Sequence, residues 1–131
     1  MNIGQVIKNA TVSQLTSQVI AAYDAPFPDP SYKGGALQFP LLVPISDDAE
    51  ALPHMRKAAE ALKSWTAPAL TLFSDKDPVT AGGDLFFRTV IPSAKDEPEI
   101  TIRDAGHFLQ EDKGEQIAGH IVAFLQRRPI D

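Results

Sequence analysis

Two short apolar runs, each followed by a polar loop and a helical pattern, restrict what the second half of this 131-residue chain can fold into. The first run is Pro68–Phe73, and the second, Glu99–Arg103, alternates in the way a strand does. Residues 80–89 and 110–127 carry apolar side chains at helical spacing. A strand–helix–strand–helix order is typical of a parallel α/β sheet. The pattern therefore predicts two parallel strands with flanking helices.

The first half of the chain follows a different pattern. Residues 1–24 have helical periodicity, with Thr11 or Ser13 as the expected cap of the second part. Between residues 25 and 53 the prolines exclude a long helix, although the apolar side chains there need burial. Residues 47–64 again have a helical pattern. This half is predicted to be a helical segment interrupted by an ordered, turn-rich stretch.

Composition excludes several classes of function. The net charge of −5 disfavours binding to nucleic acid. The chain has no cysteine, which excludes disulfides and thiolate metal sites and fits a reducing compartment. We find no signal-peptide pattern, no run of roughly 18 apolar residues that would span a membrane, and no convincing metal-ligand spacing. We therefore expect a cytoplasmic protein that binds no metal, no nucleic acid and no membrane.

The loops after the two predicted strands hold the residues most suited to catalysis. Asp75 and Asp77 follow the first strand, and Asp104 and His107 follow the second. Functional residues of open α/β sheets gather at the carboxyl ends of strands, so Asp77 and His107 are expected to be within reach of each other. A carboxylate can hold an imidazole in one tautomer, and the imidazole can then act as a general base. Alternatively, Asp77 serves only a turn and His107 only bonds the backbone, and turn or cap roles are the favoured interpretation of Asp75 and Asp104.

Five short segments resemble a known family. Ser74–Pro78 and Asp104–Glu111 resemble the last two strand-end loops of α/β-hydrolases, and of the haloalkane dehalogenases in particular. The matching subgroup is the one whose catalytic acid follows the penultimate strand. A second block, comprising Ala22–Asp29, Ser31–Gly35 and Phe39–Pro40, is similar to the cap domain of those enzymes.

The resemblance runs from about residue 10 to Leu125 and implies a division of the chain. Residues 1–65 are expected to form a cap-domain-like helical segment, and residues 66–131 the C-terminal part of the hydrolase core. It also implies a small, apolar, halogenated substrate and no cofactor. The residues that match functional positions are Asp77 as the acid, His107 as the base, and Phe39, Pro40, Val43, Val79 and Thr80 around the substrate cavity. Thr80 is more polar than the aliphatic residue expected at its position.

The sequence departs from the family at the nucleophile. Haloalkane dehalogenases displace halide with an aspartate, and a water activated by the histidine then hydrolyses the alkyl ester. The aspartate belongs on a Gly-x-Asp-x-Gly elbow, and these 131 residues contain no such elbow. The halide-binding tryptophan beside the nucleophile is also absent. Trp65, the one tryptophan, is interpreted as a core or hinge aromatic.

Three hypotheses follow, in order of preference. The chain is a dehalogenase-like piece that is inactive alone, a working enzyme completed by a second chain, or a non-catalytic module that binds small hydrophobic ligands or a partner protein. An epoxide hydrolase, which also uses an Asp–Asp–His set, is the alternative parent reaction. Open sheet edges favour a homo-oligomer or a complementing chain as partner.

Overall fold

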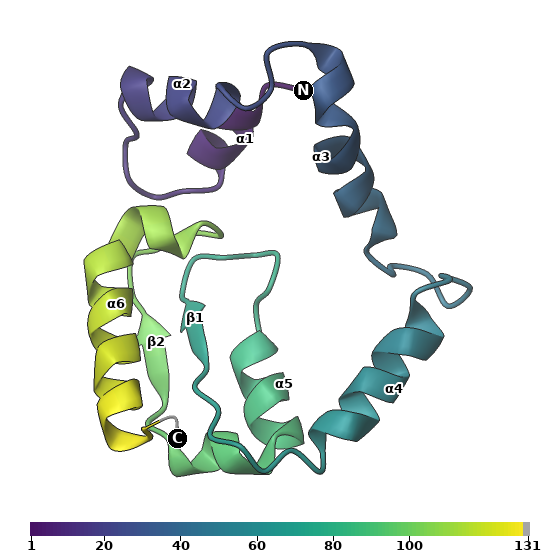
Figure 1. Ribbon diagram of the computed structural model, residues 1–131, viewed down its shortest axis with the longest axis vertical. Helices are drawn as coiled ribbons and strands as arrows, with labels where there is room; N and C mark the ends of the chain where they lie inside the picture. The colour runs from purple at the N-terminus through teal and green to yellow at the C-terminus, as the bar shows by residue number, and fades with distance from the viewer. Residues whose placement is uncertain (130–131) are drawn as a thin grey trace. The chain divides into compact units, whose positions relative to one another are not determined.

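A computed structural model describes residues 1–129 and forms two compact units (Figure 1). One unit comprises Met1–Asn9 and Leu15–Ala61. The other comprises Ala10–Gln14 together with the described residues from Leu62 onward. The segment 10–14 therefore packs with the second unit, although it lies between two helices of the first.

The first unit is helical. It contains α1 (Ile3–Asn9), α2 (Ser17–Asp24), α3 (Gly34–Gln38) and α4 (Leu52–Leu62). The α1–α2 pair is joined by a hydrogen bond of 3.0 Å from the Gly4 N–H to the Asp24 carboxylate. Two short 3-10 turns, Pro30–Lys33 and Phe39–Leu42, occupy the proline-rich stretch, each with a proline in its first turn. The expectation of an ordered, turn-rich stretch is therefore confirmed.

The helices of this unit are shorter than their periodicity predicts. The expected helix over residues 1–24 is broken, because residues 10–14 leave to join the second unit. The predicted caps Thr11 and Ser13 are wrong: the cap is Thr16, whose hydroxyl accepts a hydrogen bond from the Val19 N–H. The helix expected over 47–64 begins only at Leu52, after turns at residues 46–52.

The second unit is built on a parallel pair of strands, as the sequence predicts. β1 (Leu72–Ser74) and β2 (Ile100–Ile102) pair so that Leu72 lies opposite Ile100 and Ser74 opposite Ile102. In Figure 1 the strands lie side by side, with α5 (Gly83–Val90) beside β1 and α6 (Leu109–Arg127) beside β2. A 3-10 turn, Pro92–Asp96, links α5 to β2.

The observed elements are also shorter here. The pairing covers three residues of each strand, so Pro68–Thr71 of the predicted first strand has no partner strand within residues 1–129. The helix predicted from Thr80 begins at Gly83, because the side chain of Asp77 captures the N–H groups of Val79 and Thr80 in a turn. Lys113 has non-helical backbone angles and kinks α6 next to Gly114.

The buried core of the second unit is small. Ile91, Ala94, Ile102 and Ala105 are its buried apolar residues, and Ile102 is the largest side chain that is fully buried. The buried Glu97 carboxylate accepts hydrogen bonds of 2.8 Å from Arg127 and Arg128 at the end of α6. Trp65 is 48% exposed, so the core alternative for it is wrong, and the hinge alternative stays a prediction. Many larger apolar side chains of the chain remain exposed.

None of the helices within residues 1–129 is long and apolar enough to cross a membrane. In the same part of the chain no three His, Asp or Glu side chains gather in a way that would hold a metal ion.

Candidate functional site

Asp77 and His107 meet at the carboxyl ends of the two parallel strands. β1 ends at Ser74 and β2 at Ile102, and the loops that follow turn toward each other. The backbone pairing continues into the loops, because the Lys76 N–H donates to the Ala105 carbonyl at 3.1 Å. His107 Nδ1 lies 3.0 Å from Asp77 Oδ2, which is a hydrogen-bond distance. The structure therefore brings the predicted acid and base into direct contact.

The carboxylate of Asp77 is buried and well supplied with donors. Its side chain is 4% exposed. The Val79 N–H donates to Oδ1 at 2.8 Å, and the Thr80 hydroxyl donates to Oδ2, the oxygen that also contacts His107. Burial raises the pKa of Asp77, but the hydrogen bonds from Thr80, His107 and Val79 outweigh burial and hold the pKa below its usual value. Asp77 is therefore an anion at neutral pH.

The imidazole of His107 is oriented by this anion. Because Nδ1 faces a carboxylate, the proton of the neutral ring belongs on Nδ1, and Nε2 is left to accept a proton from water. The side chain is 34% exposed, so solvent reaches it. The ring of Phe108 packs edge-on against the imidazole, with centroids 5.0 Å apart. The pair has the geometry of a general base with its orienting acid.

A second carboxylate, Asp112 at the start of α6, holds the histidine loop in place. It accepts hydrogen bonds from the N–H groups of Gly106 (2.8 Å), Val12 and Ser13. The Phe108 N–H donates to the carbonyl of Ala10, so His107 is flanked on both sides by residues bonded within this cluster. Sequence reasoning missed Asp112, whose only local signal was an acidic side chain in the first turn of a helix.

We expect Asp112→Asn to lower the free energy of unfolding at pH 7 by about 1.5–3 kcal/mol, because a charged acceptor of three N–H groups is lost. Burial raises the pKa of Asp112. The hydrogen bonds from Gly106, Val12 and Ser13 outweigh burial and hold the pKa below its usual value near 3.9. This stabilisation is therefore present above about pH 4 and is lost as the pH falls through the folded-state value.

Urea unfolding of the wild type and of Asp112→Asn at pH 7 and pH 3 measures this effect, and the gap between the two proteins should shrink at pH 3. Asp104→Asn is the matched control, since Asp104 is exposed and pairs with Lys76 at the surface, where an ion pair contributes little. An equal gap at both pH values would contradict the assignment.

The remaining acidic candidates lie in turns. Asp104 has φ of 56°, a left-handed conformation that aspartate tolerates in turns, and its carboxylate pairs with Lys76 at 2.7 Å. Asp75 carries the backbone pairing beyond β1, since its N–H donates to the Ile102 carbonyl. Neither carboxylate contacts His107 in any hydrogen bond that the structure records among the described residues.

The predicted cavity residues fall in two places. Val79 and Thr80 follow Asp77 directly, and Val79 is 72% exposed. Phe39, Pro40 and Val43 belong to the first unit, where they lie on its surface, with Phe39 78% exposed. The structure thus brings Val79 and Thr80 to the Asp77–His107 pair.

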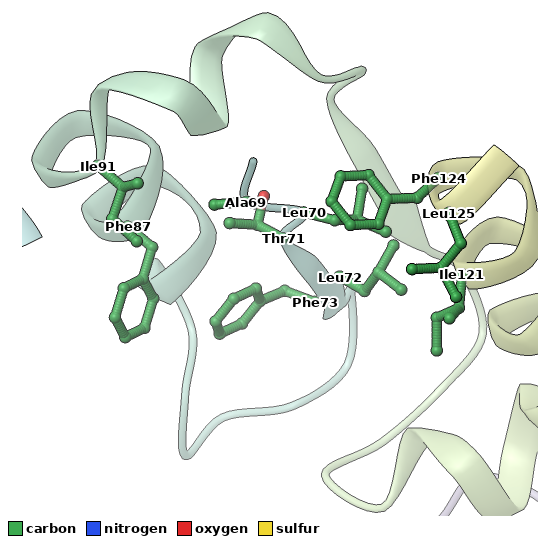
Figure 2. A pocket seen from close by; sticks show the side chains of 10 residues that line it. All are labelled: Ala69, Leu70, Thr71, Leu72, Phe73, Phe87, Ile91, Ile121, Phe124 and Leu125. Carbon is green, nitrogen blue, oxygen red and sulfur yellow. The ribbon is translucent and has the colours of Figure 1, made fainter. Parts of the chain in front are cut away.

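An apolar pocket of about 570 Å³ lies along β1 (Figure 2), and neither Asp77 nor His107 is among the residues that line it. Five consecutive residues, Ala69 to Phe73, line it together with side chains of α5 and α6. Successive residues of a strand point to opposite faces, so a pocket that all five line follows the edge of the strand. Figure 2 shows Phe87 on one side of β1 and Phe124 on the other. The edge of β1 that does not pair with β2 is therefore open and apolar.

A parallel strand pair with a hydrogen-bonded aspartate and histidine in its carboxyl-end loops is what an α/β-hydrolase contains at the end of its core. Curated relatives give the particular family. A haloalkane dehalogenase of Psychrobacter cryohalolentis is 52% identical over 98% of this chain and 42% of its own length. One of Mycolicibacterium paratuberculosis is 42% identical over 94% of the chain and 40% of its own length.

The chain is homologous to the C-terminal part of the haloalkane dehalogenases, and the similarity implies an α/β-hydrolase fold. It spans about two fifths of the length of these relatives. A cis-3-alkyl-4-alkyloxetan-2-one decarboxylase of Xanthomonas campestris is 28% identical over 89% of the chain, so a relative with another activity shares this region. No family model matches the chain.

Proposed function

We propose that this chain supplies the acid and the base of a haloalkane-dehalogenase-like hydrolase. His107 takes a proton from water through Nε2, and the activated water attacks an alkyl ester formed on a carboxylate outside these residues. Asp77 keeps the imidazole in the required tautomer and stabilises its charged form. The substrate is a small, apolar haloalkane, as the names of the relatives suggest.

The contact between Asp77 and His107 is the observation that carries the proposal. The carboxylate is buried, ionised and hydrogen-bonded, while the imidazole is partly open to solvent. A histidine that merely satisfied a backbone group would not need a buried anion at 3.0 Å. The 52% identity to a dehalogenase over nearly the whole chain supports the same chemistry.

We expect the 131-residue chain alone to release no halide from 1,2-dibromoethane or 1-bromobutane, because it contains no nucleophile elbow. Mixing it with the part of the Psychrobacter dehalogenase that precedes the matched region should restore halide release. The measurement is halide concentration against time, with and without the added part. Light scattering of the same samples gives the mass of each assembly.

The control is the same mixture made with His107→Ala, which should release no more halide than one equivalent per complex. Halide turnover by the lone chain would contradict the proposal, since another carboxylate in these residues would then be the nucleophile. If the mixture made with His107→Ala released halide as fast as the mixture made with the wild-type chain, His107 would not be the base.

The open edge of β1 favours a second candidate, a non-catalytic module that binds a small apolar ligand or an apolar protein segment. The pocket along this edge is lined by nine apolar side chains and one threonine. Titration of the chain with 1-bromobutane, followed by the NMR signals of Phe73, Phe87 and Leu125, tests this. Saturable shifts at these residues, together with failure of the complementation experiment, would favour the binding module.

The same edge of β1 is where strands of two copies would pair in a homo-oligomer, which light scattering would detect.

A further inference from the structure

Thr80 makes a contact through its hydroxyl that a residue lining a cavity would not need. Its hydroxyl hydrogen-bonds to Oδ2 of Asp77, the same oxygen that lies 3.0 Å from His107 Nδ1. We propose that Thr80 is a positioning residue, whose hydroxyl fixes the Asp77 carboxylate so that His107 is held in its Nδ1–H tautomer. This inference rests on the proposed function of the Asp77–His107 pair and adds a third residue to it.

The two oxygens of the Asp77 carboxylate accept hydrogen bonds from different donors. Oδ1 is bound by the Val79 N–H at 2.8 Å. Oδ2 receives the Thr80 N–H at 3.3 Å, a longer contact, together with the Thr80 hydroxyl. The backbone donors close the turn, whereas the hydroxyl is the strong local donor on the oxygen that faces the imidazole. Without it, Oδ2 would keep only the longer Thr80 N–H contact besides His107, so the carboxylate would be held mainly through Oδ1 and would be freer to turn Oδ2 away from the imidazole.

Burial makes this donor hard to replace. The Asp77 side chain is 4% exposed, so water has little access to the oxygen that would lose a partner. A buried carboxylate oxygen that lacks a hydrogen-bond donor costs free energy, and the carboxylate lowers that cost by rotating toward another donor. Rotation about the Cβ–Cγ bond is soft, because terminal torsions of aspartate are broad. We therefore expect the loss of the Thr80 hydroxyl to rotate the Asp77 carboxylate and to leave the backbone of the loop almost in place.

The two interpretations of Thr80 differ in what valine would do. Valine has almost the same shape as threonine and retains the N–H that closes the turn, so a residue that only lines a cavity would tolerate Thr80→Val. A positioning residue would not, because valine has no hydroxyl. Thr80→Ser keeps the hydroxyl and removes only a methyl group, which makes it the matched control.

The test is the tautomer of His107 in the full 131-residue chain, labelled with 15N and measured at a pH at which the nitrogen shifts themselves report a neutral ring. Long-range proton–nitrogen spectra distinguish Nδ1–H from Nε2–H. His54 is exposed on α4 and serves as an internal reference for the Nε2–H form that predominates in water. Asp77→Asn is the positive control for loss of the orienting anion.

We expect His107 to be mainly Nδ1–H in the wild type and in Thr80→Ser, and mainly Nε2–H in Thr80→Val. Retention of the Nδ1–H form in Thr80→Val would overturn the proposal. If Thr80→Val does not fold, Thr80→Ala removes the same hydroxyl with less bulk and is judged by the same criterion. A wild type without the Nδ1–H form would contradict the Asp77–His107 pair itself, so failure of the proposed function is distinguishable from failure of the role of Thr80.

Discussion

An enzyme assembled with His107→Ala should release one halide per active site in a burst and then turn over far more slowly than the enzyme that contains His107. The suitable protein is a chimera in which this chain replaces the matching region of the Psychrobacter dehalogenase, to which it is 52% identical. Formation of the alkyl ester needs the nucleophile, whereas its hydrolysis needs the water that His107 activates. Loss of a general base lowers the rate by about 10²–10⁴-fold, so steady-state turnover should fall by that factor while the first equivalent of halide remains.

Two measurements check this result together. Rapid-quench halide assays should show a burst that equals the enzyme concentration, and mass spectrometry should show the alkyl group on the chimera. His54→Ala is the matched control, because His54 is an exposed histidine of α4 with no proposed role. Normal turnover by His107→Ala would mean that His107 is a loop histidine and not a base. A chimera of His107→Ala with neither burst nor turnover would place His107 in the first step as well.

Replacing Gly106 with alanine should lower the free energy of unfolding of the 131-residue chain by about 1–3 kcal/mol, the usual cost of forcing an extra methyl group into a packed site. Gly106 is buried next to His107. A Cβ atom there would lie 2.5 Å from the carbonyl oxygen of Ala10 and 3.3 Å from the Cα of Thr11. Both are backbone atoms, so they cannot move without displacing the segment 10–14 that Asp112 holds.

Gly119→Ala is the matched control for this substitution. Gly119 lies in α6, and a Cβ atom there would meet nothing within 4 Å. Alanine favours a helix interior over glycine by about 1 kcal/mol, so this variant should be slightly more stable than the wild type. Urea unfolding of the three proteins measures both effects, with opposite signs expected. If Gly106→Ala were as stable as Gly119→Ala, the close packing of the histidine loop on residues 10–14 would be refuted.

The neighbourhood of Asp77 and His107 could be predicted because it depends on local pattern and on one general property of sheets. Each residue follows an apolar run, and parallel strands bring their carboxyl ends to the same edge. The alternation of residues 99–103 and the helical spacing of 110–127 predicted β2 and α6 closely. The helix predicted from Thr80 starts three residues late, since the turn chemistry of Asp77 overrides helical spacing there.

Sequence alone thus determined the order of strands and helices in the second unit and their parallel pairing, because periodicity and strand ends are encoded by neighbouring residues. The strand ends offered Asp75, Asp77, Asp104 and His107 as candidates, and the resemblance to haloalkane dehalogenases selected Asp77 and His107 among them. Tertiary structure alone decided that Asp112 binds the N–H groups of Val12 and Ser13, residues 100 and 99 positions away. It also decided that Gly106 has no room for a side chain and that the Thr80 hydroxyl contacts Asp77. These contacts depend on where the folded chain brings distant backbone groups and on which donor a buried oxygen finds, and no local pattern of residues contains that information.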